Sequence, residues 1–338
     1  VRALAAGFLL LTLAGSLPAA PRASHRARPV VQKASGPPLA EFLSLPRSGV
    51  DAEPVPELER PLPSFDVRAA SAILVDGKTG AVLFAHNADE PRPPASVTKI
   101  LTALIVLEEG RLSDLVTVSR RAATTGGYRL GLRTGQRVSL EDLLAAILIR
   151  SANDAAVAAA EHLGGSVAGF AALMNARARA IGMTHSHFVN PHGLDEPGHV
   201  TTARDMARLT RVALANPQFA RLVSVREARV NVWRPVRKRF IARPRTIFSH
   251  NKLLGLLDGA DGVKTGYTDG AGRCLVGSAS RGDQRMIAVL LNDPHRWRDA
   301  ARLLEYGFQV GGAAASLQPV TRRTVLDGTL DGVREEHP

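Results

Sequence analysis

The chain has 338 residues, of which 45% are hydrophobic and 22% charged, and its formal net charge is +12 at pH 7. This balance excludes an intrinsically disordered chain, because there is enough apolar surface for a substantial core. The basic excess is compatible with nucleic acid, but no helix-turn-helix or RNA-binding signature accompanies it, so we expect no nucleic-acid partner.

The N-terminal residues predict export. Arg2 precedes an apolar run from Ala3 to Leu13, and small and turn-forming residues follow through Ala23. This is the layout of a secretory signal peptide, and the apolar run is too short to span a bilayer comfortably. We interpret residues 1–23 as a signal peptide, with retention as an anchor as the alternative. Export to the periplasm or cell envelope favours an acidic envelope polymer or an anionic lipid surface as the counterpart of the basic charge.

Proline content and apolar patterning predict the domain limits. Ten of the 21 prolines lie between Pro18 and Pro63, so residues 24–64 are expected to form an extended linker. The folded domain is expected to span residues 65–312, and residues 313–338 are expected to form a tail, because they show no amphipathic stripe and no C-terminal membrane-anchor helix is apparent in them. The single cysteine, Cys274, excludes an internal disulfide and is expected to be a core residue.

Apolar periodicity predicts the elements of this domain in chain order. Two short apolar runs around the turn 76–80 predict a hairpin. Helical spacing predicts helices from about residue 96 to 109 and at 140–149, 153–163, 168–181, 202–215 and 297–306. Strands are expected at 229–232, 274–280 and 286–291. Six basic residues between Arg234 and Arg245 are expected on a solvated hairpin or loop. This order predicts an α+β fold in which helices flank an antiparallel sheet.

The first candidate for chemistry is Pro94-Ala95-Ser96-Val97-Thr98-Lys99, at the start of the first predicted helix. One helical turn brings Lys99 onto the face of Ser96. Serine is a poor nucleophile at neutral pH unless a neighbouring base accepts its proton, and an amine can do so. Backbone N–H groups at a helix start can also stabilise an oxyanion. The alternative is an N-cap serine beside a solvent-exposed lysine.

Two further segments complete a possible site. Ser151-Ala152-Asn153 lies between two predicted helices, where Ser151 can relay a proton and the Asn153 amide can bind a substrate backbone; alone, it is a plausible helix cap. Lys264-Thr265-Gly266 follows a predicted turn at 258–262 and precedes a predicted strand. Its cation and hydroxyl suit a substrate carboxylate, while Gly266 leaves room for substrate against the backbone.

Two similar segments are interpreted differently. Lys78-Thr79-Gly80 repeats the third segment but lies in the predicted hairpin turn, so we assign it a structural role. Ser249-His250-Asn251-Lys252 satisfies both Ser-x-x-Lys and Ser-x-Asn, but no long helix follows to orient Ser249.

The ordered set Ser-x-x-Lys, Ser-x-Asn, Lys-Thr-Gly is far more specific than any one of its members, and it is shared by class A β-lactamases and penicillin-binding proteins. From about Phe65 to Gln309 the chain resembles the serine-type D-Ala-D-Ala carboxypeptidases, the low-molecular-mass penicillin-binding proteins. The resemblance extends to the segments 151–156, 190–194 and 264–272.

The resemblance implies a β-lactamase/transpeptidase-like fold, with the site between the sheet and a helical lobe. It implies that Ser96 forms the acyl-enzyme, with Lys99 as base. It also implies that Ser151 and Asn153 serve proton transfer and substrate positioning. Lys264 and Thr265 of the Lys-Thr-Gly segment would receive the terminal carboxylate. The Tyr267 amide would join that of Ser96 in an oxyanion hole. The implied partners are peptidoglycan stem peptides ending in D-Ala-D-Ala and β-lactam inhibitors, with no cofactor and no metal.

Three alternatives remain at this point. A β-lactamase needs a carboxylate that activates water. Asp195 and Glu196 lie in a loop that could approach the site, but the Glu-x-x-Leu-Asn pattern of class A enzymes is absent. A zinc peptidase could use His185, His187, His192, His199 and Asp195, although His-Glu-x-x-His is absent. The third alternative is a catalytically inactive wall-binding module.

Overall fold

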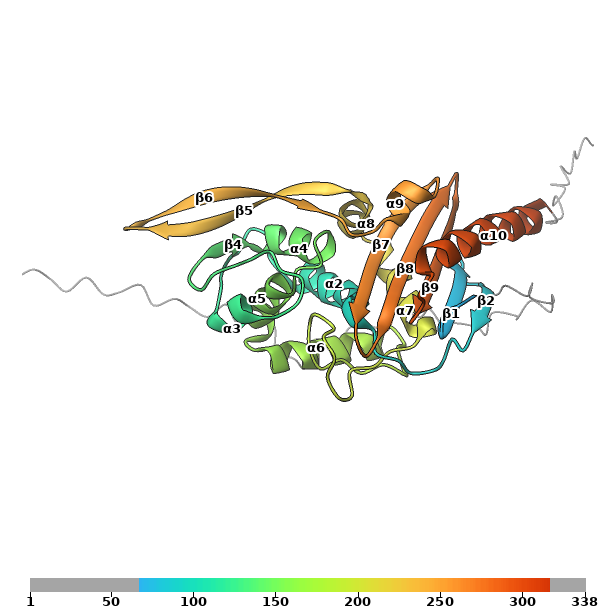
Figure 1. The fold of residues 1–338 in the computed structure, drawn as a ribbon, viewed down its shortest axis with the longest axis horizontal. Helices are drawn as coiled ribbons and strands as arrows, with labels where there is room; N and C mark the ends of the chain where they lie inside the picture. The colour runs from blue at the N-terminus through green and yellow to red at the C-terminus, as the bar shows by residue number, and fades with distance from the viewer. Residues whose placement is uncertain (1–66, 317–338) are drawn as a thin grey trace, which may run out of the picture. The chain divides into compact units, whose positions relative to one another are not determined.

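The computed structural model describes residues 67–316, which belong to one compact unit. The predicted signal peptide and linker, residues 1–64, lie outside the described residues, as does the predicted tail from residue 317 onward. The rest of the chain forms an antiparallel sheet flanked by helices and a largely helical lobe beside it (Figure 1). This is the α+β architecture that the order of elements predicts.

The larger sheet has five strands in the order β2-β1-β9-β8-β7, and every neighbouring pair is antiparallel. The strands are β1 (Ser71–Asp76), β2 (Val82–His86), β7 (Ala260–Thr268), β8 (Gly272–Arg281) and β9 (Gln284–Leu291). The predicted hairpin is confirmed as β1 and β2. Strand β7 was not predicted, and its first residues lie in the segment 258–262, which the sequence indicated as a turn.

Helices cover both faces of this sheet, which explains why its inner strands, β1, β8 and β9, are buried over most of their length. In β1, Ile73 and Val75 pack into the main core on one face, whereas Ala72 and Leu74 pack into a second core on the other. Such continuous apolar strands are expected where neither face meets water. The second core is closed by α10 (Arg296–Ser316), which extends well past the predicted helix 297–306.

The main core continues from the sheet into the helical lobe. The remaining helical elements are η1 (Ala95–Thr98), α2 (Lys99–Glu109), α3 (Arg120–Thr124), α4 (Leu140–Leu148), α5 (Asn153–Gly164), α6 (Val167–Ala180), α7 (Ala203–Leu214), α8 (Pro217–Ser224) and α9 (Leu253–Leu256). The predicted helices in this region are confirmed, and α3, α8 and α9 are additional. In α5 the first eight residues are all buried, as expected for a helix surrounded by core.

A second, four-stranded sheet was not predicted. It has the order β3-β4-β5-β6, formed by β3 (Leu115–Thr117), β4 (Arg137–Ser139), β5 (Glu227–Val236) and β6 (Arg239–Phe248). Strands β5 and β6 form a long hairpin that extends past the helical lobe (Figure 1). The basic cluster lies on this hairpin, as expected, but Arg245 is half-buried and donates a hydrogen bond to the Leu130 carbonyl instead of facing solvent.

Within residues 67–316, no single helix has both the length and the apolar composition needed to cross a bilayer. The helices α5 and α6 pass that test only as a pair, by length and composition, and they are bent by 83°.

Candidate active site

Ser96 lies in a short 3₁₀ turn, η1, that leads directly into α2. In a 3₁₀ turn, side chains three residues apart eclipse one another, so Lys99 lies directly over Ser96. The Lys99 Nζ is 2.9 Å from the Ser96 Oγ. The alternative of an N-cap serine beside a solvent-exposed lysine is wrong, because Ser96 caps no helix and Lys99 is fully buried.

Ala95 fixes the position of this turn. It is fully buried and has a positive φ of 50°, a backbone conformation that is uncommon for alanine and that costs on the order of 1 kcal/mol. Two glycines pack on either side of it. A Cβ at Gly193 would collide with the Ala95 carbonyl oxygen, and a Cβ at Gly266 would lie 3.0 Å from the Ala95 Cβ and 3.1 Å from the Ser96 N. The nucleophile turn is therefore held between a loop and strand β7, at two points where no side chain fits.

Lys99 has the environment of a general base. Its Nζ also donates a hydrogen bond to the His192 carbonyl at 2.7 Å, which directs the amine toward Ser96. Burial lowers the pKa of Lys99 well below its usual value, and the positive charge of Lys264 lowers it further. A neutral amine can accept the Ser96 proton, which a charged ammonium cannot.

The loop that supplies the His192 carbonyl is organised by Asn190. The Asn190 Oδ1 accepts from the Gly193 N at 2.7 Å, and its Nδ2 donates to the Leu194 carbonyl at 3.0 Å. The Thr102 hydroxyl of α2 donates to the Pro191 carbonyl at 2.7 Å, which ties the loop to the helix that carries Lys99. The Asn-Pro-His-Gly-Leu segment therefore positions the base through backbone groups, a role that could not be deduced from its residue types.

His199 supports the same turn. Its Nδ1 accepts from the Val189 N at 3.0 Å, so in the neutral ring Nε2 carries the proton and donates to the Thr98 Oγ1, 2.9 Å away. The Thr98 hydroxyl in turn donates to the Ala95 carbonyl at 2.8 Å. Burial lowers the pKa of His199 to about 4, which keeps the ring neutral above that pH.

Ser151 and Lys264 form a second serine–lysine pair. The Lys264 Nζ donates to the Ser151 Oγ and to the Thr265 carbonyl, both at 2.9 Å. Burial, with a smaller contribution from the Arg296 charge, lowers the pKa of Lys264 to about 7. Ser151 has a positive φ of 61° and makes no capping bond to α5, so its interpretation as a simple helix cap is wrong. The charge of Lys264 depresses the pKa of Lys99, so the two serine–lysine pairs interact electrostatically.

Asn153 and Asp154 begin α5 with different roles. The Asn153 Nδ2 donates to the Gly126 carbonyl at 2.8 Å, while its buried Oδ1 has no hydrogen-bond partner among residues 67–316. Asp154 is fully buried and accepts hydrogen bonds from the Leu130, Gly131 and Leu132 backbone N–H groups. Asp154 therefore anchors the loop beside the site, and Asn153 presents an unused acceptor.

The Lys-Thr-Gly segment lies in the middle of β7, the edge strand of the five-stranded sheet, instead of just before a strand. Lys264 and Thr265 are buried, and Tyr267 is 57% exposed with its hydroxyl donating to the Asp269 Oδ1 at 3.0 Å. The space that a side chain would occupy at Gly266 is filled by the Ser96 turn. The substrate-binding roles of these residues stay predictions.

Arg296 is a residue that the sequence analysis missed. Its guanidinium donates to the Gly266 carbonyl at 2.7 Å and to the Cys274 carbonyl at 3.1 Å. It thus places a positive charge beside the Lys-Thr-Gly segment. Only the packing of α10 against the sheet brings it there, and no local motif marks it. Cys274 itself is buried, and burial raises the pKa of its thiol to about 11, as expected for a core residue.

Arg296 also lines a cavity of about 640 Å³ that contains the second Ser-x-x-Lys segment. The lining residues are Tyr128, Ser249, His250, Lys252, Arg273, Pro294, Arg296 and Trp297. The Ser249 Oγ accepts from the Asn251 N at 3.2 Å, and the helix that follows, α9, has four residues. Ser249 therefore lacks the long helix and the buried lysine that Ser96 has. Lys78-Thr79-Gly80 forms the exposed β1–β2 turn, with Asp76 accepting from the Lys78 and Thr79 N–H groups.

The groups invoked for a β-lactamase or a zinc site are engaged elsewhere. Asp195 accepts from the Thr268 hydroxyl at 2.6 Å and the Gly270 N at 2.9 Å, so it ties its loop to the end of β7. Glu196 accepts from the Asn190 Nδ2 at 3.3 Å. Among the described residues, no group of three or more His, Cys, Asp or Glu side chains has an arrangement that could hold a metal ion.

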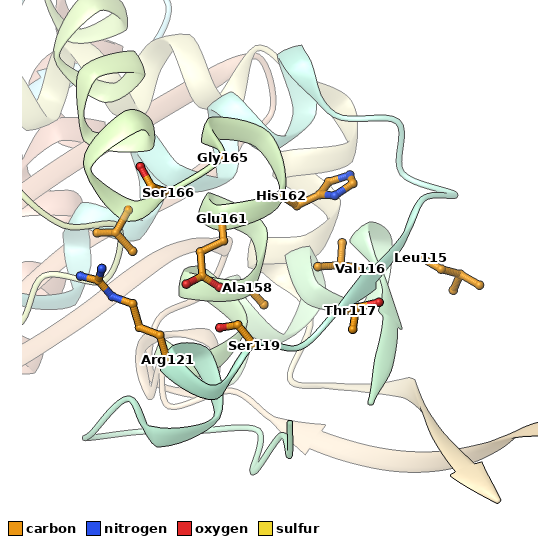
Figure 2. A pocket seen from close by; sticks show the side chains of 11 residues that line it. Leu115, Val116, Thr117, Ser119, Arg121, Ala158, Glu161, His162, Gly165 and Ser166 are labelled. Atoms are coloured by element: carbon orange, nitrogen blue, oxygen red, sulfur yellow. The ribbon is translucent and has the colours of Figure 1, made fainter. Parts of the chain in front are cut away.

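A separate hollow of about 540 Å³ lies on the helical lobe, between β3, α3 and α5 (Figure 2). Its polar lining includes Arg121, Glu161 and His162, and the His162 Nε2 pairs with the Asp114 carboxylate at 3.2 Å. None of the predicted site residues lines it. The chemistry is therefore concentrated between β7 and the start of α2.

The fold is an antiparallel sheet beside a helical lobe. One serine–lysine pair lies at the start of a helix, and the lysine of the second pair comes from an edge strand. This combination defines the active-site serine class that includes penicillin-binding proteins. Residues 57–295 match the family described as D-alanyl-D-alanine carboxypeptidase, peptidase family S11. The chain belongs to this family.

Individual relatives agree with this assignment. The chain is 38% identical to the D-alanyl-D-alanine carboxypeptidase DacC of Escherichia coli over 76% of its length, and 35% identical to DacF of Bacillus subtilis over 71%. It spans 65% and 62% of these two proteins. The crystal structure of the Streptomyces K15 DD-transpeptidase superposes with a TM-score of 0.68 at 29% identity, covering 72% of this chain and 98% of that one.

Proposed function

We propose that this protein is a serine D,D-carboxypeptidase that removes the terminal D-alanine from peptidoglycan stem peptides through an acyl-enzyme on Ser96. The observation that carries the proposal is the contact between Ser96 and a fully buried Lys99 whose pKa is depressed, with a second lysine–serine pair beside it. The proposed partners are peptides ending in D-Ala-D-Ala and β-lactam inhibitors.

Acylation follows from this geometry. As the Ser96 Oγ attacks the carbonyl of the penultimate D-alanine, its proton passes to the neutral Lys99 Nζ. The backbone N–H groups of Ser96 and Tyr267 are proposed to stabilise the oxyanion. When the C–N bond breaks, the leaving amine of D-alanine takes a proton from the Ser151 hydroxyl, which Lys264 can replace. The charge of Lys264 and the Thr265 hydroxyl hold the terminal carboxylate, and the Asn153 Oδ1 is free to accept from a substrate N–H.

Deacylation completes the cycle. After D-alanine leaves, the proton that Lys99 took from Ser96 passes to the neutral Lys264, which restores both amines. Water then gives a proton to Lys99 as it attacks the ester carbonyl, and Ser96 takes that proton when the bond between its Oγ and the acyl group breaks. A penicillin adduct differs because its leaving group stays tethered to the acyl group and keeps water from the ester. Hydrolysis of that adduct needs a dedicated base, and Asp195 and Glu196 are tied to other groups.

The test of the function compares the two acyl-enzymes. We expect steady-state release of D-alanine from an acylated D-Ala-D-Ala peptide, and a penicilloyl adduct on Ser96 that outlives the peptidyl adduct by orders of magnitude. Bound labelled penicillin is followed after excess is removed. Rapid penicillin turnover with negligible D-alanine release would instead identify a β-lactamase. Transfer to an added amine acceptor in preference to water would identify a transpeptidase.

The pH dependence tests the role of Lys264. Its side chain is charged below about pH 7 and neutral above, so kcat/KM for a peptide with a free carboxylate should fall as the pH rises through 7. A bound carboxylate favours the charged lysine, so the corresponding fall in kcat should occur at higher pH. The same peptide with a C-terminal amide is the control and should lack this shift between kcat/KM and kcat. If both peptides show the same profile, Lys264 does not receive the carboxylate.

We also propose that the protein acts after export, in the periplasm or cell envelope. The support is the signal-like pattern of residues 1–23, together with a substrate class that lies outside the cytoplasmic membrane once assembled.

A further inference from the structure

The β5–β6 hairpin is the most basic part of the described chain. Residues 227–248 carry seven Lys and Arg residues and one acidic residue, Glu227, at the start of β5. Three of these, Arg237, Lys238 and Arg239, are consecutive and exposed at the turn. None of the residues assigned to the active site belongs to this hairpin, so the catalytic mechanism does not account for its charge.

The same tip exposes apolar side chains. Val236, Phe240 and Ile241 are 44%, 38% and 42% exposed. They are three of the nine large apolar side chains that are exposed among residues 67–316, and they lie within six consecutive positions. Such a concentration on a soluble surface costs free energy unless a partner covers it.

The strand register places these side chains on both faces of the hairpin. Val236 pairs with Arg239 and Pro235 pairs with Phe240, so Val236 and Phe240 point to opposite faces. The Arg137 guanidinium of β4 lies 4.3 Å from the Phe240 ring centroid and covers part of the ring, which leaves Phe240 38% exposed. Ile241 pairs with Arg234, which puts it on the face of Val236. Nearer the body, Val230 and Val232 on that face are buried, so on the Val236 face the exposed apolar side chains lie at the outer end of the hairpin. On the opposite face Phe248, at the base of β6, is also exposed.

We propose that the tip of this hairpin, residues 234–243, docks the enzyme on an anionic lipid bilayer, with the apolar side chains entering the headgroup boundary and the cations contacting lipid phosphates. A folded partner or a wall strand would contact one face of the hairpin and leave the other in water. A bilayer surrounds an inserted tip, which matches apolar side chains on both faces. The combination of cations with apolar side chains is typical of interfacial membrane binding, whereas an acidic wall polymer needs only the cations.

The position of the hairpin fits this role. The tip of the hairpin extends past the helical lobe, whereas β7 and the start of α2 lie toward the other end of the hairpin (Figure 1). Docking through the tip therefore leaves Ser96 uncovered. The proposal does not depend on the reaction assigned to Ser96, and it concerns a segment within the described residues, separate from the apolar run at the N-terminus.

The first experiment reports directly on insertion. Because Cys274 is buried, Ile241→Cys in the full chain can be labelled with an environment-sensitive fluorophore. Vesicles of phosphatidylglycerol and phosphatidylcholine should shift its emission to the blue, and lipid-borne quenchers should quench it. The matched control is Val82→Cys on β2, an exposed apolar position at the far edge of the other sheet. An unchanged spectrum at Ile241, or an equal shift at Val82, would overturn the proposal.

The second experiment separates charge from apolar contact. Each cation close to an anionic surface contributes about fivefold to partitioning, so Arg237→Gln, Lys238→Gln and Arg239→Gln combined should weaken vesicle binding about 100-fold. The control removes three exposed cations elsewhere, Arg111, Arg120 and Arg179, and should have a much smaller effect.

A second combined variant, Val236→Ser, Phe240→Ser and Ile241→Ser, should weaken vesicle binding at least tenfold while penicillin labelling of Ser96 stays normal, which shows that the fold is intact. Binding to isolated wall material that depends on the cations but not on these apolar residues, together with no binding to vesicles, would show that the partner is a wall polymer and the proposal is wrong.

Discussion

Replacing Ser96 with alanine is expected to abolish penicillin labelling and to lower kcat/KM for D-alanine release by at least about 10⁴-fold, the scale seen when a serine hydrolase loses its nucleophile. The reason is geometric. Ser96 and Ser151 each lie 2.9 Å from a buried lysine of depressed pKa, but Ser96 is the one in the turn before α2 that is fixed by the packing of Ala95 between two glycines. Labelling is measured with a fluorescent penicillin, followed by peptide mapping of the modified residue.

The matched control is Ser249→Ala. Ser249 shares the Ser-x-x-Lys spacing but is followed by a four-residue helix, and its hydroxyl accepts from the Asn251 N. This variant should be labelled normally. Labelling that survives in Ser96→Ala and disappears in Ser249→Ala would refute the assignment of the nucleophile.

Lys99→Arg is expected to lose acylation by about 10² to 10⁴-fold, the usual contribution of a general base. Arginine keeps a positive charge at any accessible pH and cannot accept the Ser96 proton. The measurement is the second-order rate of penicillin acylation, with a thermal melt to establish that the fold survives.

A buried guanidinium can itself destabilise the fold, so Lys99→Met is the companion variant. Methionine has a similar length and no charge, and its main cost is the loss of the bond to the His192 carbonyl. Both variants should be folded but slow to acylate. Near-normal acylation by a folded Lys99→Met would show that another group, with Lys264 as the first candidate, removes the proton.

The pairing of each serine with its lysine could be predicted from sequence to different extents. Ser96 and Lys99 are three residues apart, so local helical geometry alone brings them together, and the sequence is sufficient to predict their contact. Ser151 and Lys264 are 113 residues apart, and only the packing of β7 against the helical lobe places their side chains 2.9 Å apart. For Ser151 and Lys264, the order of the motifs predicted that both residues belong to the same site, but it did not predict that their side chains are in contact.

Most of the supporting contacts of the site depended on the tertiary structure. The Lys99 amine is oriented by the backbone carbonyl of His192, 93 residues away in the sequence. The Thr98 hydroxyl bonds locally to the Ala95 carbonyl but is held by the ring of His199, 101 residues away. Arg296 reaches the Gly266 carbonyl from a helix that follows two further strands. Backbone groups and long-range side-chain contacts carry no local sequence signal, so they could not be foreseen.

The fold, like the site, could be predicted from the sequence only in part. The sequence by itself determined the first hairpin, the long helices and the antiparallel character of the sheet, because apolar periodicity and turn residues act over a few positions. Only the tertiary structure decided the second sheet, the start of β7 within an apparent turn, and the burial of both lysines. The sequence shows that a residue is lysine, but it does not show whether the side chain lies in water or in the core. The depressed pKa values on which the proposed chemistry depends exist only once the surrounding elements exclude water from the two amines.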